Sequence, residues 1–213
     1  MAKKKTKSST APKRAIKKAI VKEKYAGPND GKTRCAWCLG DPIYVSYHDE
    51  EWGRAVHDDK LLFEFLVLES FQAGLSWLTI LRKRENFRKA FANFDVKKVG
   101  KFDQKKFNEL MQNEGIVRNR LKIEAAINNA QRFMEIQKEF GSFDKYVWGF
   151  VGGKPLVNRL KSLSEIKAKT DISDAMSKDM GIRGFKFRGS TICYAFMQAV
   201  GMVNDHVEGC WKK

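Results

Sequence analysis

Residues 180–201 read MGIRGFKFRGSTICYAFMQAVG, and they decide the fold because they hold a helix end, a glycine-rich turn and a helix start. The first helix is expected to end at Gly181. After the turn, Ser190 suits the N-cap of a second helix, and Gly201 suits its C-terminal stop. The pattern predicts two helices joined by a hairpin.

Three glycines, at positions 181, 184 and 189, permit the tight turns and positive φ angles that such a hairpin requires. They also bare backbone N–H groups at the start of the second helix, where the helix dipole favours a DNA phosphate. Cationic side chains lie in the same turn. The residues expected to bind the DNA backbone are Gly184, Lys186, Arg188 and Gly189. The alternative is an ordinary turn between two helices.

The rest of the body also has a helical pattern. Apolar residues from Leu61 to Leu68 recur at spacings of three and four, and a second apolar helix begins at Trp77 after a break at Gly74. Further helices are expected at residues 104–113, 120–140 and 172–180. We find no convincing alternating strand and no internal repeat. The sequence therefore predicts an all-α fold.

Charge points to a polyanionic partner. The 213 residues carry a formal net charge of +16, and residues 1–33 hold eleven Lys and Arg against two acidic residues. Such a balance favours nucleic acid, because each Lys or Arg that meets a phosphate releases a condensed counterion. Residues 1–33 have little to bury, so we expect a disordered or weakly helical basic arm, which binds an anion or only adds solubility. The composition changes at Arg34–Cys35, and residues 34–213 are expected to form one globular domain.

No apolar run is long enough to span a bilayer, and the Lys-rich start does not resemble a secretory signal. The sequence therefore predicts no membrane partner and a cytoplasmic location, or a nucleoid-associated one in a bacterium.

Cysteines and histidines gather near both ends of the body, in CAWCLGDPIYVSYHDEEWG (35–53) and NDHVEGC (204–210). Four cysteines are too few for a disulfide scaffold of this size. His206 and Cys210 stand four residues apart, so they can share one face of a helical turn. The first segment offers Cys35, Cys38 and His48 as the other half of a tetrahedral zinc site, which would tie the two ends together. Packed side chains without a metal are the alternative.

Three stretches, RCAWCLGDPIYVSYHDEEWG (34–53), LESFQAGLSWLTILRKRENFRKAF (68–91) and RGFKFRGSTICYAFMQAVGMVNDHVEGC (183–210), together resemble the bacterial 3-methyladenine DNA glycosylase I family. The hairpin resembles that of the wider helix-hairpin-helix DNA glycosylase superfamily, and residues 115–130 resemble the helix that usually precedes it. The resemblance covers residues 34–210, and the basic arm has no place in it. It implies a helix-hairpin-helix glycosylase-like domain whose N- and C-terminal segments are joined by a structural zinc site.

The resemblance also implies one structural zinc ion per chain, with two Cys and two His ligands. Those ligands fall here on Cys35, His48, His206 and Cys210. Cys38 is a rival to His48, because a CxxC pair is a common zinc half-site. Of the other candidates, Cys193 is expected in the core and His57 in solvent.

A glycosylase must hold its target base out of the stack, between aromatic faces. The family's aromatic pocket residues match Trp37, Tyr47, Trp52 and Trp77, and its acidic pocket residue matches Glu69. Such rings suit a cationic purine, because their faces attract positive charge. Glu69 is the expected catalytic residue and would also bind the base. Its alternative is a solvent-facing Glu at a helix end.

The implied reaction is hydrolysis of the glycosidic bond of 3-methyladenine in double-stranded DNA, by a monomer that does not cut the strand. No Lys stands where an imine-forming nucleophile is expected in the hairpin. Asp205 is a weaker catalytic candidate than Glu69, and Leu75 is a candidate wedge into the gap left by the flipped base. Two other functions stay open, a non-catalytic zinc-containing DNA-binding module and a zinc hydrolase. Whether 3-methylguanine is also excised is left undecided.

Overall fold

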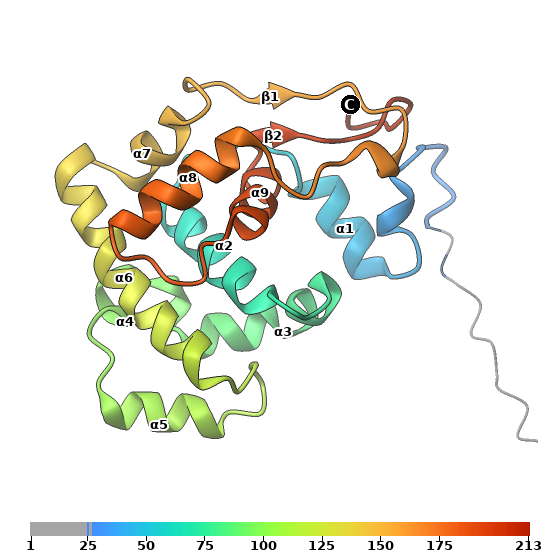
Figure 1. The fold of residues 1–213 in the computed structure, drawn as a ribbon. Coiled ribbons are helices and arrows are strands. Elements are labelled where there is room, and N and C mark those ends of the chain that lie inside the picture. Colours follow the sequence, from blue (N-terminus) through green and yellow to red (C-terminus); the bar gives the residue numbers. More distant parts are fainter. Residues whose placement is uncertain (1–24, 26) are drawn as a thin grey trace, which may run out of the picture.

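The computed structural model describes Tyr25 and residues 27–213, so residues 1–24 and 26 of the expected arm lie outside the described part. Helices dominate what is described (Figure 1). In chain order the elements are η1 (Ala36–Cys38), α1 (Pro42–Glu50), α2 (Asp59–Gln72), α3 (Trp77–Ala90), η2 (Ala92–Phe94), α4 (Val96–Val99), α5 (Gln104–Gln112), α6 (Arg120–Phe140), α7 (Phe143–Gly149), β1 (Leu156–Val157), η3 (Leu163–Glu165), α8 (Asp171–Ile182), α9 (Ser190–Ala199) and β2 (Val203–Asn204).

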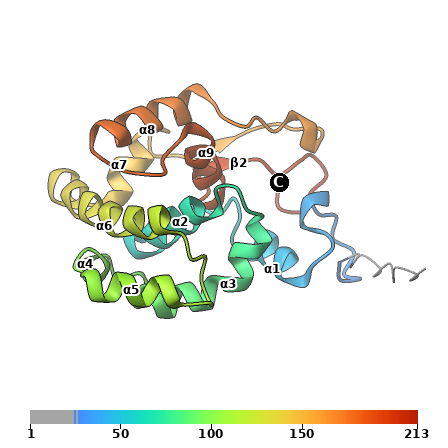
Figure 2. The ribbon, with the colours of Figure 1, turned by 60° about the horizontal axis from the view of Figure 1, so that its bottom comes forward.

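Helix α2 is the centre of the fold. It lies between α9 on one side and α3 on the other, and it also packs against α6 (Figure 2). Every residue from Leu62 to Phe71 is buried. A helix that is apolar on almost all sides is stable only when neighbours cover it on all sides. The two acidic residues in this run, Glu64 and Glu69, are therefore enclosed by protein.

The hairpin between α8 and α9 is confirmed, with one correction at its second helix. Gly189, not Ser190, is the N-cap of α9, and no described side chain caps it, so the first N–H groups of α9 have no partner among the described residues. Gly201 ends the helix as expected, with φ +71°. A Cβ at Gly201 would collide with the backbone of Arg54 and Ala55, so both its conformation and its surroundings require glycine.

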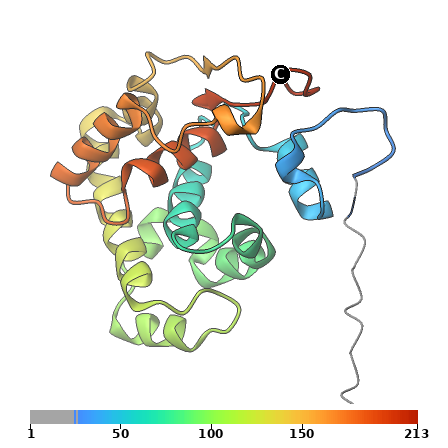
Figure 3. The same cartoon turned by 45° about the vertical axis from the view of Figure 1, so that its right-hand side comes forward.

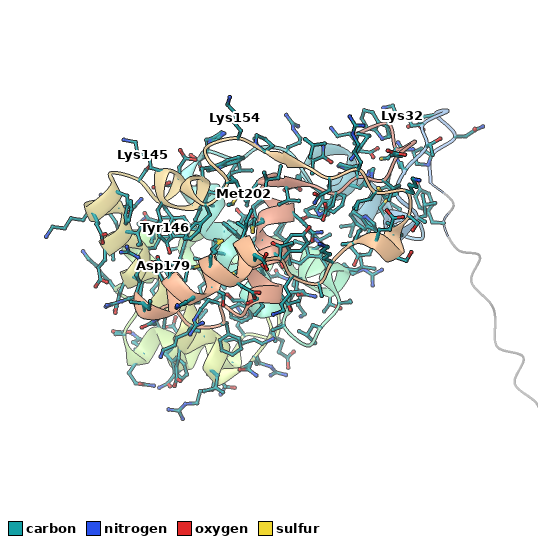
Figure 4. All side chains as sticks on the ribbon, turned by 45° about the horizontal axis from the view of Figure 1, so that its top comes forward. Lys32, Lys145, Tyr146, Lys154, Asp179 and Met202 are labelled. Atoms are coloured by element: carbon teal, nitrogen blue, oxygen red, sulfur yellow. The ribbon has the colours of Figure 1, made fainter. Side chains whose placement is uncertain are left out.

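The sequence did not predict α1, α7 or the four-residue helix α4. Helix α1 begins at Pro42 behind Asp41, whose carboxylate accepts the Ile43 N–H at 2.9 Å, and this Asp-Pro pair is an ordinary helix-start signal. Helix α7 has only seven residues, too few for a periodic pattern. Its Tyr146 donates a hydrogen bond of 2.7 Å to Asp179 of α8 (Figure 4), which ties the two helices together.

The all-α expectation needs a small amendment. Strands β1 and β2 pair in parallel, with Leu156 opposite Val203, and each strand has two residues. Two residues cannot show an alternating pattern, so the sequence carried no signal for them.

The two ends of the described chain meet beside α1 (Figure 1). The Trp211 N–H donates to the Thr33 carbonyl at 2.9 Å. Arg34 forms ion pairs of 2.6 Å with both Asp30 and Asp49. Residues 30–33, which the sequence assigned to the arm, are thus fastened to the domain. Among the described residues, no helix combines the length and apolar character that a bilayer crossing needs.

Candidate active site

A pocket of about 450 Å³ opens between the N-terminal segment, the end of α2, the start of α3 and the last turns of α9. Its size is in the range of small-molecule sites in proteins. It brings together all five residues that the sequence singled out. The lining consists of Trp37, Tyr44, Tyr47, Trp52, Glu69, Gln72, Trp77, Leu163, Ile166, Ala195 and Gln198.

Trp37 is the hub of the aromatic wall. Its ring lies 5.5 Å from Tyr44, 6.3 Å from Tyr47 and 5.0 Å from Trp52, in edge-to-face geometry each time. Trp77 of α3 joins this wall through Tyr47, with ring centroids 5.5 Å apart. Edge-to-face pairs hold each other's orientation, so the pocket presents fixed ring faces to whatever enters it.

Glu69 supplies the acidic group of the pocket. It lies on the last turn of α2 and is 4% exposed. Among the described residues, no hydrogen-bond donor or cation meets its carboxyl group, and burial alone raises its pKa to about 8. In the free protein Glu69 is therefore mainly protonated near neutral pH. A cation placed beside it would reverse this, because opposite charge favours the ionised form.

A buried lysine holds the helix end that carries Glu69. Lys122 of α6 donates hydrogen bonds of 2.7 and 2.6 Å to the carbonyl groups of Phe71 and Ala73. Burial lowers the pKa of Lys122. A cation at the C-terminus of a helix is favoured by the helix dipole. The turn from Gln72 to Ser76, with the exposed Leu75, is thus fixed at its root.

Several lining residues were missed by the sequence analysis. Leu163 and Ile166 come from the irregular segment around η3, which lies beside α1 (Figure 3). A loop without periodicity gives no signal for such a position. Gln198 follows from the α9 pattern only once the packing of α9 on α2 is known. Tyr44 was not missed, because it belongs to the same cluster of aromatic residues in the sequence as Trp37, Tyr47 and Trp52, where it is a weaker pocket candidate. It lines the pocket, and its hydroxyl accepts the N–H of Leu78 at 3.0 Å.

The four expected metal ligands lie together in the structure. The ligand atoms of Cys35, His48, His206 and Cys210 are all within 4.8 Å of one another, and all four side chains are buried. The Cys210 sulfur lies 3.4 Å from His48 Nε2 and 3.5 Å from His206 Nδ1, and the Cys35 sulfur lies 3.7 Å from His206 Nδ1. A tetrahedral zinc ion would set such S···N edges at about 3.5 Å. The residues present fit a closed zinc site.

Each histidine of this cluster is oriented by its other ring nitrogen. His48 Nδ1 lies 2.8 Å from the Asp49 carboxylate, and His206 Nε2 lies 3.2 Å from the carbonyl oxygen of Trp52. Acceptors of this kind fix the ring and its tautomer in metal sites. Cys38, the rival ligand, lies outside the cluster, because its sulfur donates to the Cys35 carbonyl at 3.1 Å.

Burial sets the protonation of the ligands when no metal is bound. It raises the pKa of Cys35 to about 12 and lowers the pKa of His206 to about 4. The thiol is then protonated and the imidazole neutral. A bound metal would displace the thiol proton, so its affinity would rise with pH.

Asp205 does not line the pocket. It is 1% exposed, and its carboxylate accepts hydrogen bonds of 2.7 Å from Tyr194, Gln198 and Asn158. Three protein donors thus hold the Asp205 carboxylate. The ranking of Asp205 below Glu69 as a catalytic candidate stays a prediction.

The hairpin backbone is held by two asparagines of α6. Asn129 accepts the N–H of Lys186 at 2.8 Å and donates to the Lys186 carbonyl at 2.9 Å, and Asn128 donates to the Gly184 carbonyl at 2.9 Å. Gly184 has φ +83°, and no atom of the described residues lies within 4 Å of the Cβ position of Gly189. The open face at the start of α9 is therefore rigidly presented.

The cations of the hairpin differ in what they are free to do. The Lys186 side chain is exposed. Arg188 donates to the Ser177 carbonyl at 3.0 Å, and its guanidinium lies over Gly181, where a Cβ would collide with it. The structure thus places Lys186 at the surface and turns Arg188 toward α8. The DNA-binding role of all four hairpin residues stays a prediction.

The architecture as a whole belongs to the helix-hairpin-helix DNA glycosylases, with the hairpin before α9 and an aromatic, carboxyl-bearing pocket at its side. Residues 37–213 match the family model described as methyladenine glycosylase, and the chain belongs to that family. The resemblance seen in the sequence is confirmed.

Relatives cover almost the same span. The chain is 50% identical over 177 residues to DNA-3-methyladenine glycosylase 1 of Escherichia coli K12, which covers 83% of this chain and 95% of that protein. It is 46% identical over 178 residues to the DNA-3-methyladenine glycosylase of Haemophilus influenzae, covering 84% of this chain and 96% of that protein. A solved structure of the Staphylococcus aureus 3-methyladenine DNA glycosylase I, which addresses 3-methyladenine recognition, has 39% identity and a TM-score of 0.82, and it covers 84% of this chain and 96% of that one.

Proposed function

We propose that this chain is a DNA repair glycosylase that hydrolyses the bond between deoxyribose and 3-methyladenine. The observation that carries the proposal is the shared pocket of Glu69 and four indole and phenol rings expected from the sequence. The relatives named above carry the same activity in their names, and one of the similar solved structures is a complex with 3-methyladenine.

The pocket favours a flipped-out cationic purine over its neutral parent. N3-methylated adenine in DNA is positively charged, and the faces of Trp37, Tyr47, Trp52 and Trp77 attract a cation. Glu69 adds the second electrostatic element, because the positive charge of the base stabilises the carboxylate that burial disfavours. Normal adenine lacks the charge and gains neither contribution.

Bond cleavage then needs little acid catalysis. The bond from C1′ to the purine breaks, both electrons go to the base, and its positive charge is neutralised. A water oxygen bonds to C1′ and loses a proton to solvent. No lysine lines the described pocket, so no imine to the sugar is expected, and the enzyme releases the base without cutting the strand.

DNA is held by the hairpin. The uncapped N-terminus of α9 presents backbone N–H groups to a phosphate, Gly184 and Gly189 let the phosphate approach, and Lys186 and Arg188 add positive charge. The substrate is double-stranded DNA with alkylated bases, bound by a monomer whose catalytic domain spans residues 34–213. It acts where the chromosome lies, which in a bacterium is the nucleoid within the cytoplasm.

A structural zinc ion held by Cys35, His48, His206 and Cys210 completes the domain. The ion would join the N- and C-terminal segments and leave no coordination position open for a substrate. It also backs the pocket wall, because the His206 ring packs on Trp52 at 4.6 Å and the His48 ring on Trp37 at 5.5 Å. No step of the reaction passes through it.

Incubation of the purified protein with methylated DNA tests the proposal directly. Release of 3-methyladenine, measured by chromatography, is the expected result, and E69Q should release it far more slowly. No release by the wild type at stoichiometric enzyme would instead favour a DNA-binding module without catalysis. Loss of activity on chelation before any unfolding would favour a zinc hydrolase.

A further inference from the structure

Gln198 lines the same pocket as Glu69 but has no part in the mechanism above. It stands on the last turn of α9, and its backbone carbonyl accepts the N–H of Gly53 at 3.0 Å, directly after Trp52. Its position relative to the aromatic wall is thus fixed through the backbone.

The orientation of the Gln198 amide is fixed as well. Its Nε2 donates to the Asp205 carboxylate at 2.7 Å. An ionised carboxylate only accepts hydrogen bonds, so Gln198 must turn its NH₂ group toward Asp205 and its oxygen elsewhere. The bond is charge-assisted and partly buried, and Asp205 is itself held by Tyr194 and Asn158. Reversing the amide would place two acceptors face to face in a buried site.

The Gln198 oxygen accepts no hydrogen bond from any of the described residues, and it is not among the buried polar atoms that lack a partner. An oriented acceptor of this kind, on a residue that lines the pocket, is suited to a ligand donor. Adenine and guanine differ at purine C6 in this respect, because adenine carries an amino donor there and guanine a carbonyl acceptor.

We propose that Gln198 is a specificity-determining residue, whose amide oxygen accepts a hydrogen bond from the exocyclic amino group of an alkylated adenine and disfavours the corresponding guanine. This inference rests on the proposed glycosylase function. The C6 carbonyl of 3-methylguanine would meet a fixed acceptor, and both oxygens would lose their hydrogen bonds to water without replacement. Asp205 acts as a positioning residue, since it touches Gln198 and not the base.

The test uses DNA that carries both N3-methyladenine and N3-methylguanine, and it measures the single-turnover release rate of each base. The wild type should favour adenine. Q198M keeps the length of the side chain and removes the amide, so the adenine-to-guanine ratio should fall about fivefold, mainly through slower adenine release. Gln137→Met is the matched control, because the Gln137 amide also donates to a carboxylate, that of Asp59 at 2.7 Å, but Gln137 does not line this pocket. That variant should keep the ratio of the wild type.

Asp205→Asn tests the positioning role. An asparagine at this place can donate, so the Gln198 amide loses its fixed orientation and the ratio should fall as in Q198M. The double variant should lower the ratio no further, because Asp205 acts on the ratio only through Gln198. Thermal melting of each variant confirms that the folded protein is being compared.

An unchanged adenine-to-guanine ratio in Q198M would overturn the inference. If the ratio were unchanged because both release rates fell by the same factor, Gln198 would act on the sugar or the water and not on the base. A further fall of the ratio in the double variant would overturn the role of Asp205. All of these results leave the proposed function intact, whereas absence of 3-methyladenine release by the wild type would overturn that function instead.

Discussion

Glu64 and Glu69 stand on the same helix, and both are almost fully buried, but only Glu64 is neutralised by cations. Arg84 and Arg88 reach the Glu64 carboxylate at 2.5 and 2.8 Å. Glu69 has no such partner among the described residues, and its pKa rises to about 8. Buried acids are normally paired, so an unpaired one beside a pocket indicates a group that waits for a ligand.

A pH dependence of catalysis follows from Glu69. In the free enzyme its active carboxylate form becomes more populated as pH rises toward about 8, so kcat/KM for base release should increase over that range. In the complex the cationic base lowers this pKa, so kcat should reach its plateau at lower pH. Single-turnover rates at limiting and saturating enzyme measure the two profiles. E69Q should be slower by a factor on the order of 100, and its rate should not rise with pH over this range. If the rate of E69Q still rose with pH, the titrating group would be another residue.

The same residue gives a prediction for stability. The pKa of Glu69 in the folded chain is raised to about 8 from 4.5, so its contribution to stability is complete below about pH 4.5 and is lost as pH rises to about 8. E69Q does not titrate, so its free energy of unfolding relative to wild type should increase over this window, by at most about 5 kcal/mol. Denaturant unfolding at several pH values measures it. A difference that does not change with pH would contradict the burial of an unpaired acid.

Helices with a periodic apolar pattern could be predicted from the sequence, whereas the packing of a loop or helix against distant segments could not. The helices α2, α3, α5, α6, α8 and α9 follow from periodicity and from glycine or cap residues at their ends. Residue type and spacing made the Cys and His residues near both ends candidate metal ligands, and the family resemblance chose His48 over Cys38. The roles of the five pocket residues followed from the resemblance, because a single aromatic residue or Glu in a sequence is more often a core or surface residue. Leu163 and Gln198 could not be placed, because their positions depend on how a loop and a helix pack across the chain.

The backbone of the hairpin between α8 and α9 is held by a side chain of another helix, Asn129 of α6. Asn129 is buried, and its amide replaces two backbone partners of Lys186. N129A should therefore weaken binding to undamaged duplex DNA about tenfold and cost about 1–3 kcal/mol of stability, because it leaves two backbone groups unpaired. Fluorescence anisotropy well below the melting temperature measures the affinity. Gln131→Ala on the same helix removes a bond to the Gly100 carbonyl only and should bind DNA like wild type. Equal affinities for N129A and Q131A would show that the hairpin needs no support from α6.

For the molecule as a whole, the cluster of Cys35, His48, His206 and Cys210 connects the first and last described segments. Removing zinc with a chelator should lower the melting temperature, and base release should be lost together with the fold or after it. Cys210→Ser should lose the metal, whereas Cys38→Ala should keep one zinc per chain, because Cys38 lies outside the cluster. Atomic absorption on the purified variants gives the stoichiometry. Metal-free protein with an unchanged melting temperature would contradict a structural role.

The positive charge of the N-terminal residues is expected to strengthen DNA binding by the whole molecule. Residues 1–24 hold ten Lys and Arg and one acidic residue, and residues 30–33 are fastened to the domain, so the informative deletion ends before Tyr25. Removing residues 1–24 should weaken DNA binding and flatten its dependence on salt, because fewer counterions are released. The logarithmic slope should fall by about 0.9 for each phosphate that the shortened protein no longer neutralises.

The pocket and the hairpin lie in the remaining domain, so single-turnover base release from a saturated short duplex should be unchanged. Affinity titrations between low and physiological salt measure the slope. An unchanged slope would mean that these cations do not meet phosphates, and a loss of folding would mean that they belong to the domain.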